Sequence, residues 1–169
     1  MSHDFSSFNS FALFVRDVTG TYREAQTDEV LQAAQSMLLS RVRNTEVFTS
    51  PQAVRDFLRV RLSALEHEIF AVLHLDAQNR VLEYVEMFRG TVSQTSVYPR
   101  EVVKESLARN SAAVILVHNH PSGAAQPSRA DEALTQTLKA ALSLVDVRVL
   151  DHLIVAGADV VSFAEMGLL

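Results

Sequence analysis

The chain has 169 residues, 48% of them hydrophobic, which is enough for one globular domain with a sizeable core. Its net charge of −5 argues against a protein that holds nucleic acid through a broad basic surface. The absence of cysteine excludes disulfide scaffolds, thiolate metal sites and thiol nucleophiles. The N-terminal segment has no basic region and no long apolar run, so we expect a cytoplasmic protein without a membrane segment.

Two helices are predicted near the N-terminus, after a partly ordered lead-in over residues 1–25. The first begins at Thr27, because apolar residues then recur at helical spacing as far as Val42. The second begins at Ser50 and Pro51, which suit the N-cap and the first helical position, and it continues to Leu62. We expect residues 1–45 to form a helical extension and residues 46–169 to form the main domain.

The rest of the chain alternates strands with helices. Short apolar or period-two runs predict strands over 68–75, 80–88, 112–118, 147–155 and 159–163, with a tight turn at 76–79 and a closing hairpin at the end. Helical spacing predicts one helix from Pro99 to about Arg109 and a longer one from Ser128 to about Leu144. This order predicts an α/β or α+β mixed sheet flanked by helices.

The residues that carry chemistry follow the central strand, with the spacing H-x-H-x7-S-x2-D. A step of two along a strand sends His118 and His120 to the same side, and Asp131 lies in the first turn of the next helix. Two histidines and one carboxylate are the ligand set of a catalytic zinc site, which keeps its fourth position open. The sequence therefore predicts Zn²⁺ as the cofactor, bound by these three residues.

A nearby carboxylate would be needed to move protons, and Glu68, at the start of the first apolar strand, is the candidate general acid/base. Each of these residues also has a simpler interpretation. Ser128 and Asp131 have the spacing of a capping box that opens a helix. A glutamate at a strand end is commonly a solvated charge. His74 and His152 lie in apolar strands and are interpreted as satisfied core or edge histidines.

The sequence resembles the RadC family of bacterial proteins, whose JAB/MPN domain carries the JAMM zinc motif, E…H-x-H-x7-S-x2-D. The resemblance covers about residues 46–169. Besides the HNHPSG block, it is carried by the segments TSP (49–51), LEHEIF (65–70), FRGT (88–91), VYPREVV (97–103) and VDVRVLDH (145–152). It implies a JAB/MPN-like, cytidine-deaminase-like sandwich. Residues 27–45 look like the helical lead-in of short RadC-like proteins rather than the helix-hairpin-helix domain of longer ones.

The resemblance also implies roles for the site residues. It implies His118, His120 and Asp131 as zinc ligands, Glu68 as general acid/base, and Ser128 as the hydroxyl that supports the tetrahedral intermediate. The wider JAMM family includes deubiquitinating isopeptidases and related amide hydrolases. We therefore expect a zinc metallopeptidase that cleaves a peptide or isopeptide bond in a peptide or protein substrate.

The alternative is a DNA repair or replication-associated protein with a nuclease or non-enzymatic role, although the acidic charge balance does not support a nucleic-acid partner. A third hypothesis is a binding module in which the metal only stabilises the fold. The intact Glu68 and Ser128 speak against it, because a structural metal needs neither residue.

Overall fold

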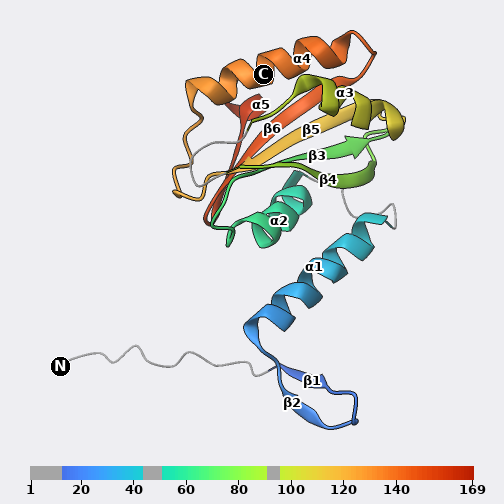
Figure 1. Cartoon of the computed structure of the whole chain (residues 1–169), viewed down its shortest axis with the longest axis vertical. Coiled ribbons are helices and arrows are strands. Elements are labelled where there is room, and N and C mark those ends of the chain that lie inside the picture. Colours follow the sequence, from blue (N-terminus) through green and yellow to red (C-terminus); the bar gives the residue numbers. More distant parts are fainter. Residues whose placement is uncertain (1–12, 44–50, 91–95) are drawn as a thin grey trace, which may run out of the picture.

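The structure is a computed structural model that describes residues 13–43, 51–90 and 96–169 (Figure 1). The predicted N-cap Ser50 and the expected domain boundary at residues 45 and 46 lie outside the described residues. No helix in the described part of the chain is long and apolar enough to cross a membrane.

The N-terminal part contains a hairpin that the sequence did not predict. Strands β1 (Phe14–Arg16) and β2 (Tyr22–Glu24) pair antiparallel, and helix α1 (Thr27–Arg43) follows from the predicted start. The turn is organised by Asp17, whose Oδ1 accepts the backbone N–H groups of Thr19 and Thr21 at 2.9 and 3.0 Å. These side-chain hydrogen bonds stabilise the turn. The two short strands lack the alternation of apolar residues that marks a buried strand, so periodicity did not reveal them.

The main domain is built on the predicted mixed sheet. Its five strands lie in the order β4-β3-β5-β6-β7, and only β5 and β6 are parallel neighbours. The strand bounds are β3 Ile69–Leu75, β4 Val81–Arg89, β5 Ala113–Asn119, β6 Arg148–Ala156 and β7 Asp159–Ser162. The predicted turn at 76–79 is confirmed, with Asp76 Oδ1 accepting the N–H groups of Gln78 and Arg80.

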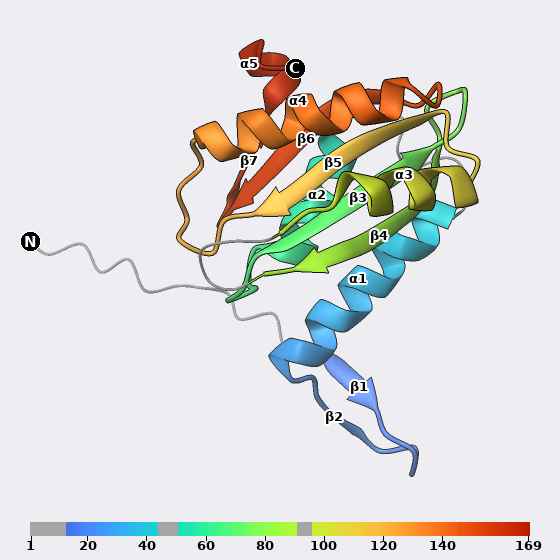
Figure 2. The ribbon, with the colours of Figure 1, turned by 45° about the horizontal axis from the view of Figure 1, so that its top comes forward.

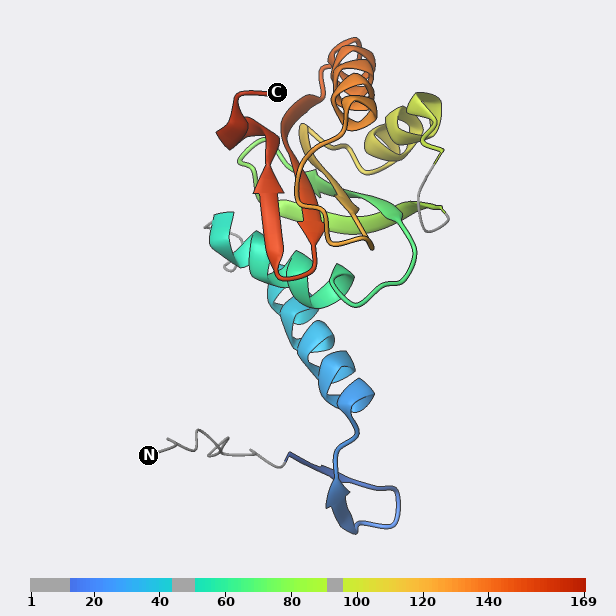
Figure 3. The same cartoon turned by 90° about the vertical axis from the view of Figure 1, so that its left-hand side faces the viewer.

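Helices cover both faces of the sheet, as Figures 2 and 3 show. Helix α2 (Pro51–Leu62) packs on one face, and α3 (Pro99–Ala108) and α4 (Arg129–Ser143) pack on the other. The predicted α/β fold of a mixed sheet flanked by helices is therefore confirmed. The predicted last strand ends one residue early, because Ser162 Oγ accepts the N–H of Glu165 and so caps the short helix α5 (Phe163–Met166).

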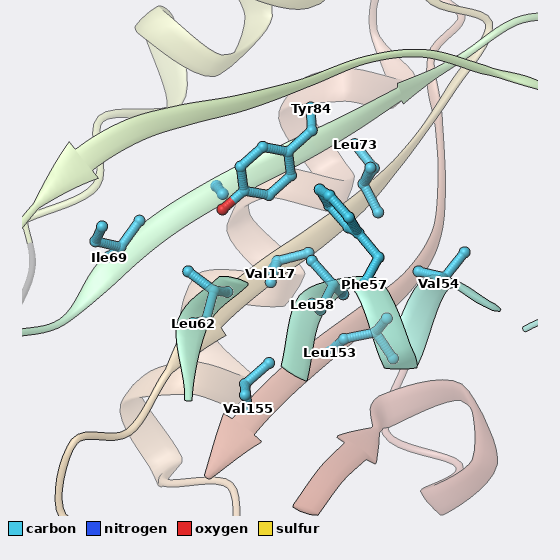
Figure 4. Close-up of a cluster of buried hydrophobic side chains, with 11 residues drawn as sticks. Val54, Phe57, Leu58, Leu62, Ile69, Leu73, Tyr84, Val117, Leu153 and Val155 are labelled. Atoms are coloured by element: carbon cyan, nitrogen blue, oxygen red, sulfur yellow. The ribbon is translucent and has the colours of Figure 1, made fainter. Parts of the chain in front are cut away.

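Successive side chains of the central strands point to opposite faces of the sheet, so the core has two layers. Ile69, Ala71 and Leu73 point towards α2, where they meet its buried residues, Phe57 among them (Figure 4). Phe70 and Val72 point the other way, into the layer under α3 and α4, and β5 contributes Val114 and Leu116 to that layer. His118 is the next even-numbered residue of β5, so it lies on the α3/α4 side of the sheet.

Candidate metal centre

The three predicted ligands meet where β5 ends and α4 begins. The Nε2 atoms of His118 and His120 lie 2.9 Å apart. Asp131 places its Oδ1 atom 3.3 Å from His118 Nε2 and its Oδ2 atom 3.5 Å from His120 Nε2. One ligand atom from each residue lies within 4.8 Å of the others. This donor set of two imidazoles and one carboxylate can bind a metal ion.

The strand end fixes the two histidines. His118 is 2% exposed inside the sheet, and it pairs with Phe70 on the antiparallel strand β3. His120 lies just beyond the strand, where its backbone N–H donates to Val155 O on β6 at 2.8 Å. Its ring Nδ1 donates to Ala124 O at 2.7 Å, since a carbonyl oxygen only accepts. The Nε2 atom of neutral His120 therefore keeps its lone pair towards the centre.

Ser128 and Asp131 form the capping box that was the simpler interpretation of the pair. Ser128 Oγ accepts the N–H of Asp131 at 3.2 Å, and Asp131 Oδ2 accepts the N–H of Ser128 at 2.7 Å. The same carboxylate faces both histidines. Capping and ligation are therefore compatible, because the cap holds the carboxylate at the end of the helix that meets the strand.

The charges of the centre favour an anionic Asp131 beside cations. Burial alone would raise the pKa of Asp131, but its contacts with the His118 and His120 rings outweigh burial and lower that pKa far below its usual value. The hydrogen bond to Asp131 raises the pKa of His120 against the opposing effect of burial. Both shifts have the same origin, which is that the Asp131 carboxylate faces the two histidine rings.

His152 contacts His118 from behind, and Thr135 in turn contacts His152. His118 Nδ1 lies 2.8 Å from His152 Nε2, and His152 Nδ1 lies 2.6 Å from Thr135 Oγ1. Thr135 and His152 are fully buried, and burial lowers the pKa of His152 well below its usual value. The sequence interpretation of His152 as a satisfied core histidine is confirmed, but it missed the contact with the predicted ligand His118. The signal available was a histidine in an apolar strand together with a threonine one turn after Asp131.

His74 was also interpreted as a satisfied histidine, and for this residue the interpretation is only partly correct. Its Nδ1 lies 2.9 Å from Ser111 Oγ, but its buried Nε2 has no hydrogen-bond partner among the described residues. It is therefore only half satisfied.

The centre opens into a cleft of about 500 Å³ that also contains the other two predicted site residues, Glu68 and Ser128. Glu68 lies just before β3, which begins at Ile69, one residue later than predicted. Apolar side chains form much of the wall, and the described lining includes no lysine or arginine. The described residues that line the cleft are Glu68, Phe70, Val97, His118, His120, Pro121, Ser122, Ala124, Gln126, Ser128, Ala130, Asp131 and Leu134. The roles assigned to Glu68 and Ser128 stay predictions.

Asn119, between the two histidines, joins them to the segment that carries Glu68. Its Oδ1 accepts the N–H of Ile69 at 2.7 Å, and its Nδ2 donates to His67 O at 3.0 Å. The side chain is 2% exposed. Sequence reasoning treated Asn119 only as the spacer of the H-x-H pair, and no local pattern marks an amide that bonds a distant backbone.

The sheet, its covering helices and the histidine-carboxylate group together define an α/β domain with a candidate metal site, consistent with a JAB/MPN-like fold. The chain belongs to the RadC-like JAB domain family, whose model matches residues 48–168. The resemblance found in the sequence is thereby confirmed.

Curated relatives agree with this assignment. A UPF0758 protein of Methylibium petroleiphilum is 63% identical over 150 residues, which cover 89% of this chain and 68% of that protein. UPF0758 proteins of Leptothrix cholodnii and Aromatoleum aromaticum are 59% and 61% identical over 150 and 151 residues, again 89% of this chain and 68% and 67% of theirs. The matched region thus spans about two thirds of each relative.

Proposed function

We propose that this protein is a zinc-dependent hydrolase that cleaves an amide bond, peptide or isopeptide, in a peptide or protein substrate. The observation that carries the proposal is the cleft in which Glu68 and Ser128 lie together with the His118, His120 and Asp131 group. A metal that served the fold alone would need no ionisable Glu68 in the cleft, whereas Ser128 also has a structural role as the N-cap of α4.

His118, His120 and Asp131 would hold the metal through the atoms that converge at the end of β5. A zinc ion bound there supplies a Lewis acid for the substrate carbonyl and lowers the pKa of a bound water towards neutrality. Three protein ligands suit a catalytic rather than a structural zinc site, since structural sites are closed by four.

Glu68 is the group that moves protons in this proposal. Its carboxylate takes a proton from the attacking water and passes it to the amide nitrogen as that nitrogen leaves. Glu68 is half-buried at the edge of the cleft, and its backbone is held by Gly90, whose N–H donates to Glu68 O at 2.8 Å. An ionisable group on a fixed backbone beside the ligands is what this role requires.

Ser128 is the donor that stabilises the developing negative charge. Its Oγ accepts the N–H of Asp131, which uses a lone pair and leaves the hydroxyl hydrogen available for donation. A hydroxyl at the cleft can then donate to the substrate carbonyl oxygen as charge accumulates on it.

The charge of the cleft favours an amide substrate over a nucleic acid. Its described lining carries the carboxylates of Glu68 and Asp131 and no lysine or arginine. Phosphate backbones are bound mainly by lysine and arginine, so this lining offers a phosphodiester no cationic side chain besides the metal. The apolar wall formed by Phe70, Val97 and Leu134 suits an uncharged side chain next to the scissile bond.

The experiment is a cleavage screen with purified, zinc-loaded protein against mixed peptides, lysine-linked isopeptides and single- and double-stranded DNA. We expect cleavage of peptides or isopeptides that is lost on chelation and restored by zinc. Cleavage of DNA alone, or no cleavage by protein with stoichiometric zinc, would refute the amide hydrolase proposal.

A further inference from the structure

We propose that Thr135 and His152 are positioning residues that hold the ring of His118 in the tautomer that binds metal. This proposal rests on the metal centre of the proposed function, but not on its substrate. The three side chains form a buried chain behind the centre, with contacts of 2.6 Å from Thr135 Oγ1 to His152 Nδ1 and 2.8 Å from His152 Nε2 to His118 Nδ1.

The direction of this hydrogen-bond chain is set at its far end. Thr135 Oγ1 also lies 2.6 Å from the backbone oxygen of Asp131, and a carbonyl oxygen can only accept. A hydroxyl has one hydrogen, so Thr135 donates it to Asp131 O. Thr135 Oγ1 must then accept from His152 Nδ1, because two oxygen or nitrogen lone pairs at 2.6 Å would repel.

The constraint passes from His152 to His118. A neutral imidazole carries one N–H, so a protonated Nδ1 leaves Nε2 of His152 as an acceptor. His118 Nδ1 faces that acceptor and carries the hydrogen. His118 Nε2 therefore keeps its lone pair, and it is the atom that lies near His120 Nε2 and Asp131 Oδ1. The reverse direction would place a hydrogen on Nε2 and block it as a ligand.

Burial makes this chain effective. Thr135 and His152 are fully buried and His118 is 2% exposed, so water does not offer these groups alternative partners. The chain begins and ends on Asp131, through its carbonyl oxygen at one end and its carboxylate at the other. The position of α4 and the tautomer of His118 are thus coupled through the protein interior.

His120 is held differently. Its Nδ1 donates directly to Ala124 O in the loop before α4, and its side chain is 16% exposed. Nδ1 of each histidine is therefore fixed by a separate partner. When no metal lies between the rings, the 2.9 Å contact of their Nε2 atoms requires a hydrogen on one of them, and the tautomer of His118 assigns that hydrogen to His120. Loss of Thr135 should affect His118 alone.

The first test measures zinc affinity by competition with a chromogenic chelator. Thr135→Val removes the hydroxyl at nearly constant volume. Because Thr135 reaches His118 only through His152, the variant should weaken zinc binding by about 10-fold, the lower end of the usual effect of losing a partner of a metal-bound histidine. Thr135→Ser should restore most of the affinity. Thr137→Val is the matched control, because Thr137 makes the same bond to the oxygen four residues earlier, at 2.8 Å, on the exposed side of α4.

The second test reads the tautomer without any metal. ¹H–¹⁵N correlation spectra of the imidazole rings in the metal-free wild-type protein should show His118 protonated at Nδ1 and His152 protonated at Nδ1. A hydrogen on His118 Nε2 in the neutral ring, or unchanged zinc affinity in folded Thr135→Val protein, would overturn the proposal. If Thr135→Val does not fold, the spectrum of the metal-free wild-type protein tests the proposal by itself. It also separates this proposal from the proposed function, because a wild-type protein that cleaves no amide still reports its tautomer.

Discussion

The side chain of Asn119 fastens the backbone on both sides of Glu68. Its amide accepts from the residue after Glu68 and donates to the residue before it, at 2.7 and 3.0 Å. Asn119 is also flanked by His118 and His120. The two histidines that could hold a metal and the proposed proton carrier lie about 50 residues apart in sequence, and one buried amide therefore links them.

The first prediction tests this link. Asn119→Ala leaves the buried N–H of Ile69 without its acceptor and should lower the free energy of unfolding by about 1–3 kcal/mol, measured by urea denaturation. Gln78→Ala removes an exposed amide in the β3–β4 turn and should change stability by less than about 0.5 kcal/mol. Equal stabilities of the two variants would show that the Asn119 contacts contribute nothing.

The second prediction concerns metal content. The protein should bind one zinc ion per chain, and His118→Ala or His120→Ala should abolish stoichiometric binding, because two remaining ligands hold zinc poorly against water. Elemental analysis after gel filtration measures the ratio. His67→Ala is the control, since the His67 side chain lies outside the centre and should leave the zinc content unchanged. Wild-type protein that stays free of zinc after loading would contradict the ligand assignment.

The third prediction separates the two functions of the capping box. Ser128→Ala removes the cap and should cost about 0.5–2 kcal/mol of stability while zinc stays bound. Asp131→Asn keeps an acceptor for the N–H of Ser128 but removes the charge that faces both histidines. It should therefore release zinc with a smaller loss of stability. If both variants kept stoichiometric zinc, Asp131 would be a capping residue only.

The predicted ligand set needed only local information. A step of two on a strand and the third position of a capped helix are both properties of a few neighbouring residues, so the convergence of His118, His120 and Asp131 could be predicted from spacing. The order of helices and strands followed from periodicity for the same reason. The sequence left open whether Asp131 caps a helix or binds metal, and the structure shows that its carboxylate can do both.

The supporting residues could not be predicted, because their contacts depend on strand register. His152 faces Thr135 only because β6 pairs with β5 as Leu116 with His152, after a register shift between Val114 and Ile115. A slip of one residue would send the His152 side chain to the α2 side of the sheet. Asn119 likewise bonds a backbone about 50 residues away.

The fourth prediction concerns pH and the other buried histidine. Burial, with a smaller contribution from the Arg109 charge, lowers the pKa of His74 to about 4 from the usual 6.5. The folded protein therefore binds this proton less readily than the unfolded chain. The neutral ring contributes full stability above pH 6.5, and that contribution is lost as the pH falls from about 6.5 through about 4.

Comparison with His74→Gln isolates this effect. Glutamine does not titrate, so the stability of the wild type relative to the variant should fall by on the order of 3 kcal/mol between pH 7.5 and 4. Urea denaturation at a series of pH values measures the difference, and the titration of the metal centre cancels because both proteins contain it. A constant difference across this range would mean that the folded state accepts a proton on His74 without cost.

The last prediction concerns Glu68 and separates an enzyme from a metal-stabilised fold. Glu68→Gln is nearly isosteric and removes only the ionisable group, so zinc content and the free energy of unfolding should stay close to wild type. Hydrolysis of a substrate found in the cleavage screen should fall by about 10²–10⁴-fold, the usual contribution of general acid/base catalysis. The matched control is Glu66→Gln, because Glu66 is exposed, lies two residues earlier and does not line the cleft. It should retain the wild-type rate. A fully active Glu68→Gln protein would show that Glu68 takes no part in the reaction. Equal losses of activity in both variants would show that the overall charge near the cleft, rather than a proton carried by Glu68, limits the rate.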